Sequence, residues 1–418
     1  MNSKQTAQYG AWKSPISSEL VSRGAIGIGQ ADIDGSDIYW LEMRPAEGGR
    51  YVLVRRDGTG GQTRDVTPAE YNVRTRVHEY GGGAYIVDNG TVYFSNFSDQ
   101  RMYRQTIGSV PEPLTAAGPY RYADAVIDPA RKRLVCVRED HTESDQDATN
   151  SLVGVNIENG AVTELVAGND FYSTPRLSPD GTRLAWLTWN HPNMPWDGTE
   201  LWVADVADNG DIGAANKVAG GNDESVFQPE WSPDGVLYFV SDRTGWWNLY
   251  RYRDSGIVPL CEKEAEFGVP QWLFKMTTYT FVSARSIICV YREKGRDRLA
   301  RLDLESGELT DIDLPYSNIS NVVGGSGKVV FHAGSPSEPV SLVLLDTPET
   351  NEYVVLRRAT SVAVESKYLS EPEHIEFPTE TGQTAHAFFY PPKNDDFVAP
   401  DTEPVSYTHL TLPTIYSV

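Results

Sequence analysis

Cysteine is scarce in this sequence, and long apolar runs are missing. The 418 residues include three cysteines, Cys136, Cys261 and Cys289, and none of them belongs to a C-x-x-C pair. Each lies in or beside an apolar segment, so we interpret them as free thiols of a reducing compartment. No stretch approaches the ~20 apolar residues of a membrane-spanning helix, and the N-terminal segment has no signal-peptide core. We therefore expect a cytoplasmic protein with no membrane partner.

Positive charge is also in short supply. Lysine and arginine total 36 residues against 58 aspartates and glutamates, which gives a net charge of −22. So acidic a surface repels phosphate backbones, and we expect no nucleic-acid partner. No cluster in the sequence has the spacing of a zinc site, so we expect neither a metal nor a cofactor.

Helical periodicity is almost absent from the chain. From about Ala31 to Arg358, apolar strands of four to six residues alternate with turns that contain glycine, aspartate or asparagine. Examples of such strands are 38–41, 51–54, 91–94, 134–137, 184–187, 201–204, 236–240, 287–290 and 329–331. Many short strands at regular spacing predict an all-β sandwich, barrel or propeller.

An internal repeat selects the propeller. Leu177-Ser178-Pro179-Asp180-Gly181 recurs as Trp231-Ser232-Pro233-Asp234-Gly235, and Ile127-Asp128-Pro129-Ala130 is a weaker copy. The interval of about 50 residues is the size of one four-stranded blade. Proline and glycine suit the tight turn between two strands, so we assign these repeats a structural role. The period predicts seven blades around a central channel, at 25–68, 74–116, 121–168, 172–220, 225–263, 268–315 and 318–360.

The rhythm changes after Thr360. Residues 373–378 and 385–392 are two strands around the turn at Thr381-Gly382, which predicts a hairpin outside the blades. We divide the chain into an N-terminal segment (1–24), the propeller (25–360) and the start of another domain (361–404). Residues 405–414 match the translation of a transposase adapter used in sequencing libraries, so we interpret residues 405–418 as an artefact.

Four stretches resemble the S9 prolyl oligopeptidase family, in its dipeptidyl-peptidase and acylaminoacyl-peptidase branch. They are Arg76-Val77-His78-Glu79-Tyr80-Gly81-Gly82-Gly83, residues 191–201 (HPNMPWDGTEL), residues 241–250 (SDRTGWWNLY) and residues 267–272 (FGVPQW). The resemblance implies a propeller that restricts access to an α/β-hydrolase domain, whose first strands correspond to the hairpin at 373–391. It also implies that the parent protein is a serine peptidase acting on short peptides.

The catalytic machinery of that family is not found in this sequence. The chain has no G-x-S-x-G nucleophile elbow, and acyl transfer needs a nucleophile, an activating base and oxyanion donors. We therefore assign no catalytic residue and expect the fragment to be inactive. The alternative is a non-enzymatic propeller that resembles the TolB-like binding modules, which share S-P-D-G repeats. Nothing in the sequence indicates an oligomeric state.

Two motifs are candidates for lining a substrate site. His78 and Glu79 could form a loop at the mouth of the channel, or they could satisfy backbone groups while the following glycines allow tight packing. Residues 191–200 form a proline-rich loop in which Trp196 and Glu200 could face substrate. Equally, this loop could be a connection whose tryptophan packs on the next blade.

Two acidic motifs have simpler interpretations. Glu262, Glu264 and Glu266 could pair with a peptide amino terminus, but a solvated turn is favoured. Residues 32–37 (DIDGSD) resemble a calcium loop superficially. They lack its terminal glutamate and flanking helices, so we predict a β-turn.

Overall fold

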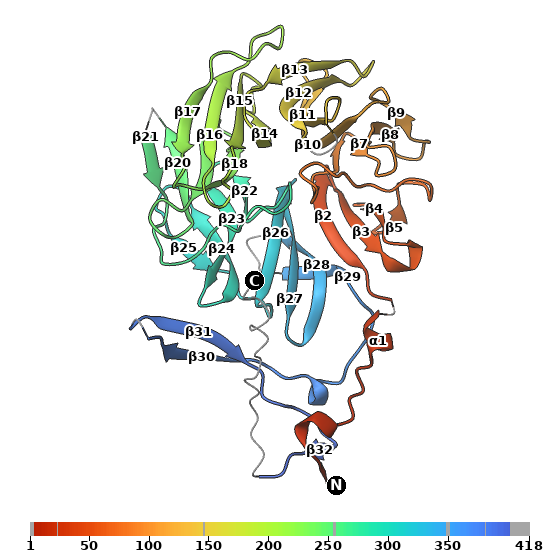
Figure 1. Ribbon diagram of the computed structural model, residues 1–418, viewed down its shortest axis with the longest axis vertical. Coiled ribbons are helices and arrows are strands. Elements are labelled where there is room, and N and C mark those ends of the chain that lie inside the picture. The colour runs from red at the N-terminus through yellow and green to blue at the C-terminus, as the bar shows by residue number, and fades with distance from the viewer. Residues whose placement is uncertain are drawn as a thin grey trace.

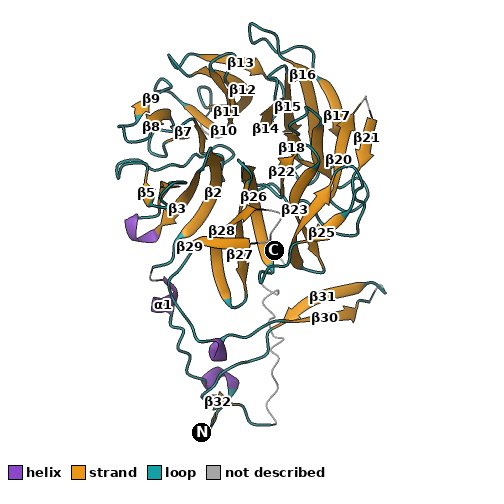
Figure 2. Ribbon diagram, turned by 180° about the vertical axis from the view of Figure 1, so that it is seen from behind, coloured by secondary structure: helices purple, strands orange, loops and turns teal. Residues whose placement is uncertain are grey.

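Seven four-stranded antiparallel sheets succeed one another along the chain of the computed structural model, which describes residues 4–22, 24–144, 147–253, 256–347, 352–380 and 382–401. The sheets stand side by side in a ring, and each is one blade of a β-propeller (Figure 1). Helical elements are short and few among these residues, as Figure 2 shows. They are η1 (Tyr9–Ala11), α1 (Ser18–Ser22), η2 (Pro45–Glu47) and η3 (Ser366–Tyr368). The predicted all-β fold with a seven-bladed propeller is confirmed.

Within each blade the strands follow one another in sequence order, and the first strand lies next to the first strands of the neighbouring blades. Blades one to four comprise β2 (Gly27–Asp34), β3 (Asp37–Arg44), β4 (Arg50–Arg56), β5 (Thr63–Asp65); β6 (Tyr85–Asp88), β7 (Thr91–Ser95), β8 (Met102–Thr106), β9 (Glu112–Pro113); β10 (Tyr120–Asp128), β11 (Arg133–Asp140), β12 (Thr149–Asn156), β13 (Val162–Val166); β14 (Phe171–Leu177), β15 (Arg183–Trp189), β16 (Glu200–Asp205), β17 (Asn216–Gly220). Blades five to seven comprise β18 (Val226–Trp231), β19 (Leu237–Ser241), β20 (Asn248–Arg253), β21 (Gly256–Pro259); β22 (Tyr279–Ser283), β23 (Ser286–Glu293), β24 (Arg296–Asp303), β25 (Leu309–Asp311); β26 (Asn318–Gly325), β27 (Lys328–Ser335), β28 (Glu338–Thr347), β29 (Glu352–Arg358).

The second strand of a blade is apolar on both of its faces. In β11, the four consecutive residues Leu134, Val135, Cys136 and Val137 are all fully buried. Leu134 and Cys136 pack towards blade two, whereas Val135 and Val137 pack towards blade four. Because each blade is covered on both sides, its central strands are apolar runs instead of the alternating pattern of a half-exposed sheet.

The repeated Ser-Pro-Asp-Gly turns join the first two strands of a blade, as predicted. In blade four, the Ser178 hydroxyl donates a hydrogen bond to the Asp180 carboxylate at 2.6 Å, and Gly181 has a φ of +70°. The corresponding glycine of blade five, Gly235, has a φ of +79°. Residues 32–37 span the equivalent junction of β2 and β3 in blade one, with Gly35 and Ser36 as the turn, so the predicted turn is confirmed there as well.

Blades seven and one close the ring without sharing a strand. A backbone hydrogen bond from Ile26 to Ala359 crosses the junction at 2.7 Å. The rest of the contact is largely apolar, and its buried members are Ala31, Ile38, Trp40, Val52, Val54, Val330, Leu342 and Leu344. Apolar side-chain packing therefore closes the ring here, without the hydrogen bonds of a strand shared by the two blades.

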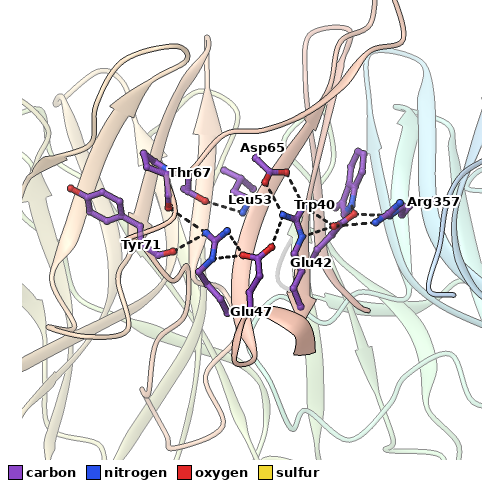
Figure 3. Close-up of polar contacts among 11 residues, drawn as sticks. Trp40, Glu42, Glu47, Leu53, Asp65, Thr67, Tyr71 and Arg357 are labelled. Carbon is purple, nitrogen blue, oxygen red and sulfur yellow. Dashed lines mark hydrogen bonds and ion pairs between the residues drawn. The ribbon is translucent and has the colours of Figure 1, made fainter. Parts of the chain in front are cut away.

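A buried carboxylate reinforces this junction. Glu42 on β3 is nearly inaccessible to solvent, and it accepts a hydrogen bond from the Trp40 indole at 3.2 Å. It also pairs with Arg44 at 2.8 Å and, across the junction, with Arg357 on β29 at 2.7 Å. Figure 3 shows Glu42 between Trp40 and Arg357. Burial of this charge is tolerable because three donors satisfy it.

A buried histidine lies at the same junction. The Nε2 of His332 lies 3.1 Å from the Gly29 carbonyl, and its Nδ1 lies 3.1 Å from the Asn321 amide nitrogen. A carbonyl only accepts and an amide nitrogen only donates, so Nε2 carries the proton and Nδ1 accepts. Burial of this neutral ring lowers the pKa of His332 from 6.5 to about 4.

We predict that this histidine makes the propeller less stable in mild acid. Between pH 6.5 and about 4 the unfolded chain binds a proton at His332 that the folded chain excludes, so stability falls as the pH falls, by up to about 3 kcal/mol. Replacing His332 with asparagine should remove this slope, although the variant is less stable overall. Urea unfolding at pH 7 and pH 5 measures the difference. Parallel pH dependences in the two proteins would contradict the assignment.

The segments outside the propeller pack against each other. β30 (Glu373–Pro378) and β31 (Thr384–Phe389) form the predicted hairpin, which lies outside the ring beside blades six and seven (Figure 1). Near the N-terminus, β1 (Gln5–Thr6) pairs in parallel with β32 (Phe397–Val398). This pairing joins the N-terminal segment (1–24) to the segment 361–404, which the sequence analysis treated as separate parts of the chain. The interpretation of residues 405–418 lies outside the described residues.

Cys136 and Cys289 are buried, Cys261 is half-buried, and all three are free thiols. Burial raises the pKa of the Cys136 thiol to about 12. In the described part of the chain, no helix has both the length and the apolar character needed to cross a bilayer.

Candidate functional site

A cavity of about 450 Å³ opens on one face of the propeller. Its walls come from the β5–β6, β11–β12, β13–β14, β15–β16 and β21–β22 connections. Because the strands of a blade are antiparallel, turns between second and third strands share one face of the ring with the links between blades. All five connections are of these two kinds. The cavity is therefore a product of the propeller topology, and its size is typical of small-ligand sites.

One wall is formed by a segment that crosses the ring, residues 271–276, which we call the strap. It belongs to the link into blade six, yet the Phe274 amide donates to the Gly81 carbonyl of blade two at 3.0 Å. The Gln271 amide lies 3.4 Å from the Thr174 hydroxyl of blade four. Lys275 lies 3.9 Å from the buried Asp124 of blade three. The strap thus ties together blades on opposite sides of the axis.

The glycine triplet 81–83 makes the crossing possible. Gly82 has a φ of +88°, and a Cβ atom there would lie 2.6 Å from the Phe274 carbonyl oxygen. At Gly83, a Cβ would lie 2.9 Å from the backbone of Asp124. Any larger residue would therefore push the strap or blade three away. The interpretation of these glycines as residues that allow close packing agrees with this geometry.

Aromatic side chains line much of the cavity. Trp196 and Trp272 lie with their ring centroids 4.4 Å apart. On another wall, Phe171 stacks on Trp189 at 5.3 Å. The ring of His78 contacts this pair and lies 4.8 Å from Phe274. Planar, apolar walls of this kind suit a flat or aromatic group of a ligand.

The loop of His78 and Glu79 is held by charge pairing. Both residues have positive φ, and the His78 amide donates to the Glu139 carboxylate at 2.7 Å. Arg121 bonds Glu79 at 2.9 Å and lies 3.4 Å from Glu139. The hydrogen bond from Arg121 lowers the pKa of Glu79, and burial lowers the pKa of His78 to about 4. Near neutral pH this loop therefore offers a carboxylate and a neutral imidazole.

Other polar groups in the cavity are incompletely paired. The described lining residues include the carboxylates of Glu79, Glu139, Asp147 and Asp170 but neither lysine nor arginine. Asp170 accepts hydrogen bonds from the backbone and ring of His191, and the backbone bond in particular lowers its pKa. In contrast, the buried atoms His141 Nδ1 and Gln271 Oε1 have no hydrogen-bond partner among the described residues. Such atoms are candidates to meet the polar groups of a ligand.

The structure places the predicted site residues as follows. His78, Glu79 and Trp196 all line the cavity, although they come from two different links of the chain. Glu200 does not reach it, because Glu200 begins β16 and forms an ion pair with Lys217 at 3.0 Å. Residues 262, 264 and 266 also lie outside the cavity lining.

Several lining residues escaped the sequence reasoning. Phe171, Trp189, Phe274, Glu139 and His141 line the cavity but belong to no motif that the sequence singled out. Trp272 belongs to the FGVPQW string but was not singled out as a site residue. The available signal was the concentration of aromatic residues at the ends of second strands and in the links between blades.

Comparison with protein-family models gave no match, and comparison with curated proteins gave none. Solved structures are similar over most of the chain. A puromycin-hydrolyzing peptidase from Mycobacterium tuberculosis is 35% identical with a TM-score of 0.88, over 95% of this chain and 63% of that one. A puromycin hydrolase is 35% identical with a TM-score of 0.87 and the same coverage. The chain carries the propeller of the S9 prolyl oligopeptidase family.

More distant members of the S9 family share the fold. The acylaminoacyl peptidase of Pyrococcus horikoshii is 11% identical, with a TM-score of 0.65 over 89% of this chain and 58% of that one. This chain spans less than two thirds of the length of each of these S9 relatives.

Proposed function

We propose that this chain is the substrate-gating propeller of an S9 serine peptidase that acts on short peptides. In this proposal, residues 361–404 begin the α/β-hydrolase domain, and the cavity beside the strap holds part of the substrate. The observation that carries the proposal is that the cavity and the hairpin share one face of the ring.

The shared face follows from contacts of the hairpin. Phe388 of β31 packs against Gly295, and Glu376 of β30 forms an ion pair with Lys294 at 3.3 Å. Both partners lie in the β23–β24 turn, which is a turn between second and third strands. The cavity uses the corresponding β11–β12 and β15–β16 connections. A domain that continues from the hairpin would therefore cover the face of the ring on which the cavity opens.

In this proposal, the catalytic residues belong to the hydrolase domain of the parent protein and not to the 418 residues of this chain. We expect the 418-residue chain to release no product from puromycin or aminoacyl amides, because it lacks the G-x-S-x-G elbow. The product of the intact gene should hydrolyse them and should contain that elbow. An intact gene without the elbow would favour the non-enzymatic binding module instead.

We predict that Trp272 contributes to substrate binding more than to chemistry. In the intact peptidase, replacing Trp272 with alanine should raise KM for puromycin by about 3- to 10-fold and change kcat little, since an aromatic contact is lost at a distance from the reacting bond. Trp246 is the matched control: it is exposed on the β19–β20 turn of the same face, outside the cavity. Equal KM values for Trp272→Ala and the unmodified enzyme would argue against the cavity as a substrate site.

A cytoplasmic location is part of the proposal. The three free cysteines, two of them buried, suit a compartment that keeps thiols reduced. Fractionation of cells that express the intact gene measures it directly, and recovery of the protein outside the cytoplasm would refute this part.

A further inference from the structure

The hairpin β30–β31 has two chemically different faces. Ile375, Phe377 and Phe389 project on one face and are each more than a third exposed. On the other face, His374 and Glu376 alternate along β30, and His386 is the cross-strand partner of Glu376. The apolar face is suited to packing in the core of the proposed hydrolase domain. The polar face contacts the β23–β24 turn through Phe388 and Glu376.

The polar face gathers three metal-ligand types in one place. The Nε2 of His374 lies 3.2 Å from the Nδ1 of His386. That same Nδ1 lies 3.6 Å from Oε1 of Glu376. One ligand atom from each of the three residues lies within 4.8 Å of the others. Ligands at Zn–N and Zn–O distances of about 2.0–2.1 Å in a tetrahedral site are about 3.3 Å apart, so these separations are close to those that one metal ion requires.

We propose that His374, Glu376 and His386 form a binding site for a divalent transition metal, with Zn²⁺ as the reference ion. Two imidazoles and one carboxylate are a ligand set that suits zinc, and they leave a fourth position for water. Imidazole also suits copper and nickel, so Cu²⁺ should bind at least as tightly as Zn²⁺ in this set. Calcium and magnesium prefer oxygen ligands and should bind poorly.

The site lies at the contact between the hairpin and blade six. Lys294 holds Glu376 at 3.3 Å, and this hydrogen bond lowers the pKa of the carboxylate. A metal ion would compete with Lys294 for the same oxygen. Metal binding should therefore loosen the ion pair that connects the hairpin to the propeller. The sequence spacing concealed the site, because its ligands come from two strands and meet only through the hairpin register.

Isothermal titration of the 418-residue chain with Zn²⁺ tests the proposal. We expect one site in the unmodified protein, and the double variant His374→Ala/His386→Ala should weaken binding by at least about 10- to 100-fold, as the loss of even an indirect partner of a ligand does. Glu376→Gln, which preserves shape, should weaken it less. Lys294→Met should tighten it, because Glu376 is then released from its competing partner.

A control on the same strand separates this site from general surface binding. Glu373 projects on the opposite face, so Glu373→Gln should bind Zn²⁺ like the unmodified protein. The double variant retains the other five histidines, including His409. Failure of the unmodified chain to bind Zn²⁺, or equal affinity in the double variant with its melting temperature unchanged, would overturn the proposal. If the double variant unfolds, the opposite shifts in Glu376→Gln and Lys294→Met decide the question.

Discussion

Replacing Gly82 with alanine should destabilise the propeller by roughly 2 to 4 kcal/mol, because the new methyl group combines backbone strain with a backbone clash. The φ of +88° is unfavourable for alanine, and the added Cβ would lie 2.6 Å from the carbonyl oxygen and 2.7 Å from the amide nitrogen of Phe274. Neither atom belongs to a flexible side chain, so the strap must move. Urea unfolding followed by tryptophan fluorescence measures the loss.

The right comparison for this variant is Gly90→Ala. Gly90 has a similar φ of +73°, but a Cβ atom there would meet nothing within 4 Å. It should therefore cost only the conformational penalty, about 1 kcal/mol. Faster amide hydrogen exchange at residues 271–276 in Gly82→Ala alone would place the damage in the strap. Equal losses in the two variants would show that the crossing contact is unimportant.

Replacing Glu42 with alanine should cost roughly 2 to 3 kcal/mol, because it removes a buried acceptor that three donors share. The Trp40 indole, itself fully buried, would lose its partner, and Arg357 would lose its contact across the junction of blades one and seven. Glu42→Gln should cost less, since it keeps an acceptor oxygen. Thermal and urea unfolding give the comparison.

A neighbouring surface pair provides the control for Glu42. Glu47 bonds Arg44 and Arg50, but it is more than a third exposed, so Glu47→Ala should cost less than about 1 kcal/mol. A double-mutant cycle with Arg357→Ala isolates the pair that crosses the junction. Additive losses at Glu42 and Arg357 would mean that this ion pair does not help to close the ring.

The propeller was predictable because its signals are local and repeated. Apolar runs such as 134–137 indicate strands covered on both faces, and the Ser-Pro-Asp-Gly turns of blades four and five mark a constant period. The loop at His78 and the tryptophan at Trp196 were chosen from strings with unusual composition, and both reached the cavity.

The other features of the fold and of the cavity depend on contacts between segments that are distant in the sequence, and composition cannot reveal such contacts. Trp272 became a site residue only because the strap crosses the ring to Gly82. The pairing of Gln5 with Phe397 joins residues almost a chain length apart through two short strands. Glu200 lies outside the cavity lining for a local reason. It is the first residue of β16, the Thr199 hydroxyl before it donates to the Val226 carbonyl of blade five, and Glu200 pairs with Lys217 of β17.

The strap also limits the routes by which a peptide could reach the cavity. A segment that leaves blade six and is bonded to blades two, three and four must pass over the axis on the face that carries the cavity. Because Phe274 of the strap is itself buried, we expect the bore of the ring to be closed to a peptide that arrives from the opposite face. A ligand of the cavity would then have to enter laterally, between the propeller and any domain that covers this face.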